Sequence, residues 1–193
     1  MLLDAAGNDD YSGGVFSQAV GYWYGIGILD DRAGDDSYHD VWYGQSATAH
    51  MGISYLDDGG GNDTYISEMT MSAGAAHDFS ASVFVDEGGN DLYRQQANCL
   101  GRSLNNSVAL FVDMGGDDRY QGKDGFGTSF SDFAKGLRAE LPTSAVFLDL
   151  DGKDVYPADS TGNNRRWIQR TATPVPLLRG VGMDGKGMRV GWK

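Results

Sequence analysis

The chain has 193 residues, a formal net charge of −12 and 29 glycines, about twice the usual share of glycine. The negative charge argues against nucleic acid and anionic membranes as partners. No apolar run reaches the length of about 18 residues that a membrane span needs, so none is expected. The single cysteine, Cys99, excludes a disulfide within the chain.

One sequence frame, Asp-x-x-Gly-(Asn/Asp/Lys)-Asp-x-Tyr, occurs six times within residues 1–157. Successive copies are spaced 27, 27, 28, 27 and 36 residues apart. The tyrosines are Tyr11, Tyr38, Tyr65, Tyr93, Tyr120 and Tyr156. The first-Asp column contains Asp4, Asp31, Asp58, Asp86, Asp113 and Asp149. The second-Asp column contains Asp9, Asp36, Asp63, Asp91, Asp118 and Asp154.

Each repeat has room for three short strands. An apolar, β-rich run precedes the first Asp, a short strand holds the tyrosine, and a stretch of small residues follows. Three strands and three turns within about 27 residues predict one coil of a three-sided, right-handed parallel β-helix. We therefore expect an all-β solenoid of five to six coils over residues 1–157. Its core strip would contain Leu29, Leu56, Phe84, Phe111 and Phe147.

Two segments depart from the repeat. An insert at about 123–142 lengthens one coil by nine residues, and its "SDFAKGLRAEL" stretch predicts a short helix capped by Ser131. Residues 158–193 carry seven Lys and Arg against two Asp and Glu, which indicates a basic, irregular tail or C-terminal cap. Because the chain opens inside a repeat, we expect further N-terminal coils in a longer parent chain.

Stacked coils would place like carboxylates about 4.8 Å apart, where neighbours repel by roughly 3 kcal/mol at an effective dielectric constant of about 20. Two interpretations explain how this repulsion would be offset. The aspartates bond to backbone N–H groups of their turns, or they bind a cation such as Ca²⁺. The candidate calcium ligands are Asp30, Asp31, Asp36, Asp57, Asp58, Asp63, Asp86, Asp91, Asp113, Asp118, Asp149, Asp151 and Asp154.

The segments "GGGNDTY", "GGNDLY" and "GGDDRY" resemble the glycine-aspartate motif of the RTX (repeats-in-toxin) calcium-binding β-roll. That resemblance implies Ca²⁺ held by aspartates and turn carbonyls. It is partial, because RTX motifs run in tandem every nine residues. Residues 1–157 more closely resemble uncharacterised bacterial proteins with spaced GDDxY repeats, a resemblance that implies the repeat architecture and no particular activity.

Two histidines are the candidates for catalysis. His50 and His77 each lie twelve residues after a repeat tyrosine, which predicts that they stack on adjacent rungs. Neighbouring imidazoles can share a transition metal or do acid–base work. The other interpretation is a polar ladder on an exposed sheet.

The first two coils are rich in aromatic residues, among them Trp23, Trp42 and Tyr43. Exposed, these rings would form a stacking platform for carbohydrate. Buried, they would meet further N-terminal coils or another subunit. The sequence leaves both interpretations open.

These features favour a non-catalytic protein. We expect an acidic, calcium-stabilised β-solenoid module that serves as scaffold or binding surface of a bacterial extracellular or periplasmic protein. The alternative is a carbohydrate-binding module, or a polysaccharide lyase or hydrolase, that uses the β-helix face. Only the fold supports that alternative.

Overall fold

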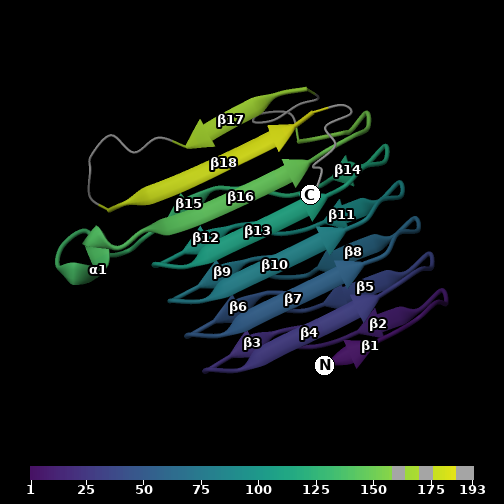
Figure 1. Ribbon diagram of the computed structural model, residues 1–193, viewed down its shortest axis with the longest axis horizontal. Coiled ribbons are helices and arrows are strands. Elements are labelled where there is room, and N and C mark those ends of the chain that lie inside the picture. The colour runs from purple at the N-terminus through teal and green to yellow at the C-terminus, as the bar shows by residue number, and fades with distance from the viewer. Residues whose placement is uncertain (158–163, 170–175, 186–193) are drawn as a thin grey trace, which may run out of the picture.

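The computed structural model describes residues 1–157, 164–169 and 176–185. They form an all-β solenoid of about five turns, about 27 residues apart, stacked from the N-terminus upward (Figure 1). The predicted fold class is therefore confirmed.

Three sheets run along the stack. The first sheet has the order β1 (Leu2–Leu3), β4 (Ile26–Asp31), β7 (Ile53–Asp58), β10 (Ala81–Asp86), β13 (Val108–Asp113), β16 (Thr143–Asp149), β18 (Leu178–Asp184) and β17 (Arg166–Gln169). The second contains β2 (Asp10–Ser12), β5 (Ser37–Asp40), β8 (Thr64–Ser67), β11 (Leu92–Arg94) and β14 (Arg119–Tyr120). The third contains β3 (Gly21–Tyr22), β6 (Thr48–Ala49), β9 (Ala76–His77), β12 (Ser103–Leu104) and β15 (Ser129–Phe130). All pairs of these strands are parallel except β17 with β18.

The coils stack in register, so like side chains form continuous core columns. Phe84 pairs with Phe111 in the first sheet, and their ring centroids are 4.9 Å apart. Tyr65 and Tyr93 stack in the second sheet at the same spacing, with ring planes only 3° from parallel. This spacing is the strand separation of a sheet, and it packs each ring flat against the next.

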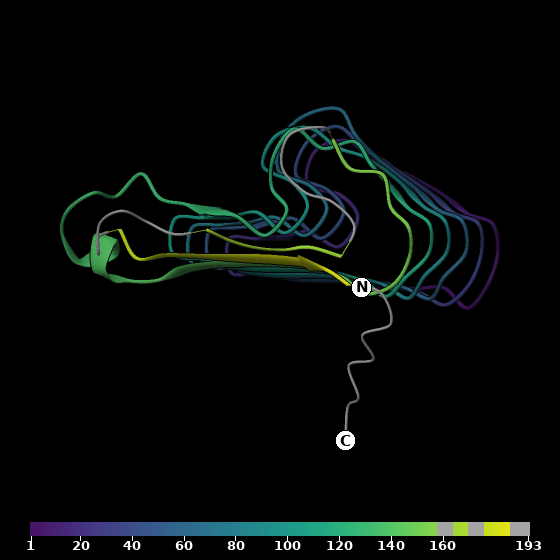
Figure 2. The same cartoon turned by 90° about the horizontal axis from the view of Figure 1, so that it is seen from above.

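Viewed along the stack, the coils overlie one another (Figure 2). The first sheet forms the long side, and the third sheet lies opposite it toward the narrow end where α1 projects. The second sheet closes the wide end. A sharp corner joins the first sheet to the second, and the repeated aspartates occupy that corner.

The nine additional residues fall between β15 and β16, within the predicted insert. They include a single turn of helix, α1 (Leu137–Glu140), which projects from the solenoid (Figure 1). The predicted cap is wrong: Gly136 occupies the N-cap position, and no side chain caps the helix. Ser131 Oγ instead accepts a hydrogen bond from the N–H of Phe133 at 3.2 Å, which makes a local turn.

The tail is more regular than expected in its described parts. Strand β18 extends the first sheet beside β16, and Asp184 lies opposite Asp149. Strand β17 pairs antiparallel with β18, and its Trp167 packs on Phe147 with ring centroids 5.8 Å apart. Of the two alternatives for residues 158–193, an irregular tail or a C-terminal cap, these two strands favour the cap; residues 158–163, 170–175 and 186–193 lie outside the described part. No described helix is long and apolar enough to span a membrane.

Candidate metal centre

The two aspartate columns face each other inside the corner between the first and second sheets. Side chains alternate between the faces of a strand, so Asp31 points inward with Leu29 while Asp30 points outward. The second Asp directly precedes the tyrosine strand and points into the same corner from the other wall. The first-column aspartates Asp31, Asp58, Asp86, Asp113 and Asp149 are fully buried.

Glycine brings successive turns into close contact. A Cβ on Gly61 would lie 1.5 Å from the carbonyl oxygen of Gly34, and a Cβ on Gly89 would lie 1.4 Å from that of Gly61. No other residue fits at this distance. The repeated glycine therefore sets how closely the aspartates of neighbouring coils approach.

The tyrosine hydroxyls lie between the carboxyl groups of the first-Asp column. Tyr65 Oη lies 2.7 Å from Asp58 Oδ2 and 3.0 Å from Asp86 Oδ2. Tyr93 Oη repeats the pattern with Asp86 and Asp113, at 2.7 and 3.0 Å. A hydroxyl has only one proton to donate. One of its two contacts therefore needs a protonated carboxyl, or else a nearby cation that offsets the repulsion between oxygens.

The second-Asp column ties each turn to the next. Asp63 Oδ1 accepts the backbone N–H of Asp36, one coil earlier, at 2.6 Å. Asp91 accepts from Asp63 and Asp118 accepts from Asp91, at 2.6 and 2.8 Å. The turn-bracing role expected from sequence is thus present, although each bond reaches across coils rather than within one turn.

The other oxygen of these carboxyl groups remains without a partner. Oδ2 of Asp36, Asp63, Asp91 and Asp118 is buried and accepts no hydrogen bond within the described residues. These side chains are at most 3% exposed, so water does not solvate the oxygen. A buried, unpartnered carboxylate oxygen is costly unless it is protonated or bound to a cation.

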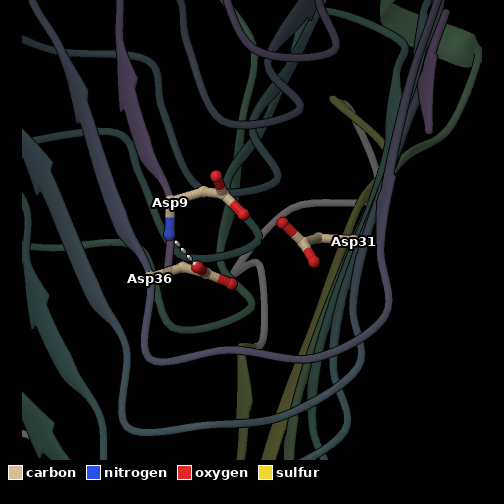
Figure 3. A group of neighbouring side chains, drawn as sticks. All are labelled: Asp9, Asp31 and Asp36. Atoms are coloured by element: carbon tan, nitrogen blue, oxygen red, sulfur yellow. Dashed lines mark hydrogen bonds between the residues drawn. The ribbon is translucent and has the colours of Figure 1, made fainter. Parts of the chain in front are cut away.

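The aspartates of the two columns form five groups of three carboxylates. Each group combines the second Asp of one coil with both Asp residues of the next, and its three potential ligand atoms lie within 4.8 Å of one another. Figure 3 shows the first group, with Asp9 and Asp36 on one wall and Asp31 on the other. The groups are Asp9–Asp31–Asp36, Asp36–Asp58–Asp63, Asp63–Asp86–Asp91, Asp91–Asp113–Asp118 and Asp118–Asp149–Asp154.

Burial makes these carboxyl groups weak acids when no cation is present. Desolvation, with smaller repulsion from Asp58 and Asp86, raises the pKa of Asp63 to about 8. Burial and neighbouring carboxylates raise the pKa of Asp91 to about 9 and that of Asp118 to about 10. The middle of the ladder therefore holds either protons or cations at neutral pH.

Ten of the thirteen predicted ligands belong to these groups, and three do not. Asp30 forms an ion pair with Arg32 at 2.5 Å, and Asp57 accepts the hydroxyl of Tyr55 at 2.6 Å. Asp151 is exposed. The third carboxylate of each group comes from the neighbouring coil and not from an adjacent residue in the sequence.

One residue of the ladder was missed from the predicted ligands. Asp9 belongs to the first group, and its place in the second-Asp column was the signal that identified it. Asp184 extends the first-Asp column past the last repeat. Its segment "VGMDGKG" lacks the second Asp and the tyrosine of the repeat, so the repeat frame does not detect it.

The two histidines lie on adjacent coils, as predicted, with ring centroids 5.7 Å apart, but their strand register is offset by one residue. In the third sheet His77 pairs with Ala49, so the residue that follows His50 along the stack is Asp78. The 28-residue repeat contains one additional residue between Tyr65 and Ala76, which shifts His77 out of line. His50 Nδ1 lies 2.9 Å from Asp78 Oδ2.

His77 has different partners from His50. Its Nδ1 lies 3.2 Å from the Tyr43 hydroxyl, and its Nε2 lies 3.3 Å from Nδ2 of Asn105. Burial lowers the pKa of His77. Neither histidine belongs to a group of three potential metal ligands within the described residues.

Comparison with protein-family models, with curated proteins and with solved structures gives no match.

Proposed function

We propose that the chain is a structural module in which a row of Ca²⁺ ions fills the aspartate corner and holds the coils together. It would act as a rigid scaffold or binding surface of a bacterial extracellular or periplasmic protein. One observation carries the proposal: Asp36, Asp63, Asp91 and Asp118 each belong to groups of three close carboxylates, and the buried Oδ2 of each has no hydrogen-bond partner in the described residues.

The dimensions of the groups suit calcium. Ca²⁺ binds oxygen at about 2.3–2.6 Å, so two oxygens on opposite sides of one ion are up to about 5 Å apart. The potential ligand atoms of each group fall within 4.8 Å. Mg²⁺ needs a tighter octahedron at about 2.0–2.1 Å and retains water, while the softer metals prefer nitrogen and sulfur ligands.

The charge of the corner also suits one divalent ion per coil. Each repeat adds one carboxylate to each column, and the second-column residues Asp36, Asp63, Asp91 and Asp118 each belong to two groups. Two negative charges per repeat are neutralised by one Ca²⁺. The shared carboxylates would couple neighbouring ions, so we expect the row to fill cooperatively.

Calcium also supports the proposed location. Calcium modules that work outside cells bind with dissociation constants of about 10⁻⁴–10⁻³ M, matched to the calcium available there. The row of ions would then be filled and stabilise the solenoid where calcium is abundant. Where calcium is scarce the ions would dissociate and that stabilisation would be lost.

The test is direct titration of the full chain. After EDTA treatment and buffer exchange, we expect isothermal titration calorimetry to show about five Ca²⁺ per chain, and calcium to raise the melting temperature. Asp30→Asn, outside the groups, serves as control and should bind the same number. If elemental analysis finds no metal and neither calcium nor EDTA shifts the melting temperature, protons occupy the corner and the proposal fails.

An enzyme acting on polysaccharide is a second candidate. The hydrogen bond between His50 and Asp78 favours it, because a carboxylate that orients an imidazole is a common acid–base arrangement. A polysaccharide panel assayed with the wild type and with His50→Ala would test it. Cleavage that is lost in the variant at unchanged melting temperature would support an enzyme.

A further inference from the structure

An exposed group of aromatic side chains lies on the first two coils. Each of its members is more than a third exposed, with Trp23 at 56% and Tyr24 at 71%. We call this group the aromatic patch, and it contains Phe16, Tyr22, Trp23, Tyr24 and Trp42. Large exposed apolar patches on proteins commonly mark binding surfaces.

The rings touch one another and form one continuous surface. Phe16 stacks on Tyr22 with centroids 4.4 Å apart, and Trp42 lies 6.4 Å from Phe16. Trp23 meets Tyr22 edge-on at 6.1 Å and lies 6.5 Å from Tyr24. Contacts between rings restrict their rotamers, so a ligand would meet a largely preorganised surface.

The backbone holds two of these residues in an unfavourable conformation. Trp23 and Tyr24 have φ of 46° and 61°, in the left-handed region, and the carbonyl of Tyr22 accepts the N–H of Gly25 at 3.1 Å. Turns of this kind favour Asn and Gly. The equivalent turn two coils beyond His50 holds Asn105 and Asn106. The turns between them hold His50 with Met51 and Asp78 with Phe79 in the same region, so the conformation belongs to the repeated turn, which here presents two large aromatic side chains.

A fixed histidine borders the patch. The His50 ring lies 4.9 Å from that of Trp23, and its Nδ1 is held by Asp78, which also forms an ion pair with Arg138. Nε2 of His50 has no hydrogen-bond partner among the described residues and is left for a ligand. The imidazole is thus oriented from behind while its outer nitrogen remains available.

We propose that the aromatic patch and His50 form a binding site for a neutral oligosaccharide. Sugar rings present C–H groups on their faces and hydroxyls at their rims. The C–H faces suit the negative π-face of Trp and Tyr. The hydroxyls suit Trp23 Nε1, the Tyr22 hydroxyl and His50 Nε2, none of which has a hydrogen-bond partner within the described residues.

Other ligand classes fit less well. Nucleic acid also stacks on aromatic rings, but a chain of net charge −12 repels its phosphates. A protein partner that covered the patch with apolar side chains would bury these N–H and O–H groups without hydrogen-bond partners. Burying an unpaired polar group is costly. Acidic polysaccharides are disfavoured by the same net charge.

The experiment uses the full chain and three soluble probes: cellohexaose, xylohexaose and chitohexaose. We expect at least one to bind, with a dissociation constant of micromolar to millimolar measured by calorimetry and a change in tryptophan fluorescence. Trp23→Ala and Trp42→Ala should each weaken that binding at least tenfold, and His50→Ala several-fold. Phe130→Ala is the matched control, since Phe130 is 46% exposed on the same sheet without contacting the patch.

Circular dichroism melting of each variant separates loss of binding from loss of fold. The proposal is overturned if none of the three hexasaccharides binds, or if Trp23→Ala and Trp42→Ala bind as well as the wild type. It is also overturned if sedimentation shows a dimer that dissociates in Trp23→Ala, because a second copy then occupies the patch. Calcium titration of the same variants should be unchanged, so the two proposals fail independently.

Discussion

Asp63 accepts the backbone N–H of Asp36, one coil earlier on the same wall of the corner, through Oδ1 at 2.6 Å, while its own Oδ2 is left buried and unpartnered. The two interpretations of the repeated aspartates are therefore compatible. One oxygen of each second-column carboxyl braces the turns, and the other remains available for a cation. A single residue type answers both needs because a carboxylate has two oxygens with several lone pairs.

Replacing Asp63 by Asn should separate these roles. The amide oxygen of Asp63→Asn can still accept the N–H of Asp36, but one negative charge is lost from the two groups that share this residue. We expect calorimetry to show about two fewer Ca²⁺ per chain. In EDTA the variant should melt above the wild-type temperature once the pH exceeds about 8, because its amide stays neutral where the buried Asp63 carboxyl would ionise.

Asp57→Asn is the matched control for this prediction. Asp57 lies next to Asp58 in sequence, accepts the hydroxyl of Tyr55 and belongs to none of the five groups. It should bind as many ions as the wild type. Equal stoichiometry in Asp63→Asn and Asp57→Asn would contradict the shared-ligand geometry.

The metal-free chain should lose stability as the pH rises. Burial raises the folded-state pKa of Asp58 to about 6, of Asp63 to about 8 and of Asp118 to about 10, above the usual aspartate value of 3.8. The folded chain then binds protons that the unfolded chain releases. Its stability is full below about pH 4 and falls as the pH rises through the folded-state values.

Urea unfolding in EDTA at pH 5 and pH 8 measures this effect. In saturating calcium the chain should instead be more stable at pH 8 than at pH 5, because Ca²⁺ competes with protons for the same oxygens and binds better at high pH. A metal-free chain that is more stable at pH 8 than at pH 5 would show that the buried aspartates are ionised and otherwise compensated.

Tyr93→Phe should weaken the solenoid without removing a stacked ring. The hydroxyl of Tyr93 contacts Asp86 and Asp113, and the residue is fully buried. Losing a buried hydrogen bond to a carboxyl costs about 1–3 kcal/mol. Urea unfolding in calcium measures the loss, and Tyr24→Phe, whose hydroxyl is exposed to water, should change stability by less than about 0.5 kcal/mol.

Gly61→Ala should disrupt folding. The added methyl group would lie 1.5 Å from the carbonyl oxygen of Gly34, so the two coils would have to separate. We expect a loss of about 3 kcal/mol or more, seen as a lower melting temperature or as loss of the β signal in circular dichroism. Gly14→Ala, which meets no atom within 4 Å, should fold normally.

The solenoid could be predicted because every coil repeats one pattern at fixed spacing. Tyr65 and Phe84 each stack on equivalent residues of neighbouring coils, so residues at the same position of the sequence repeat lie next to one another in the structure. Residues that alternate along a strand point to opposite faces, and that rule explains why Asp58 is a ligand candidate while Asp57 is not.

The composition of the site was less predictable, because each group takes one carboxylate from a neighbouring coil. Asp36 joins Asp58 and Asp63 only because the coils stack, and a motif confined to one turn contains no such information. The pairing of His50 with Asp78 depends on where a single additional residue falls within a repeat. The 28-residue spacing revealed that residue but not its position.

The insert between β15 and β16 has a practical consequence for engineering. Nine additional residues are inserted there, yet β13 and β16 stay in register from the pair Val108–Ser144 to the pair Asp113–Asp149. The edge that joins the third sheet to the first therefore tolerates changes in chain length while the aspartate corner does not. Foreign loops, or whole folded domains with adjacent termini, should be accepted at this edge in any coil, so that cargo can be displayed at regular intervals along the rod.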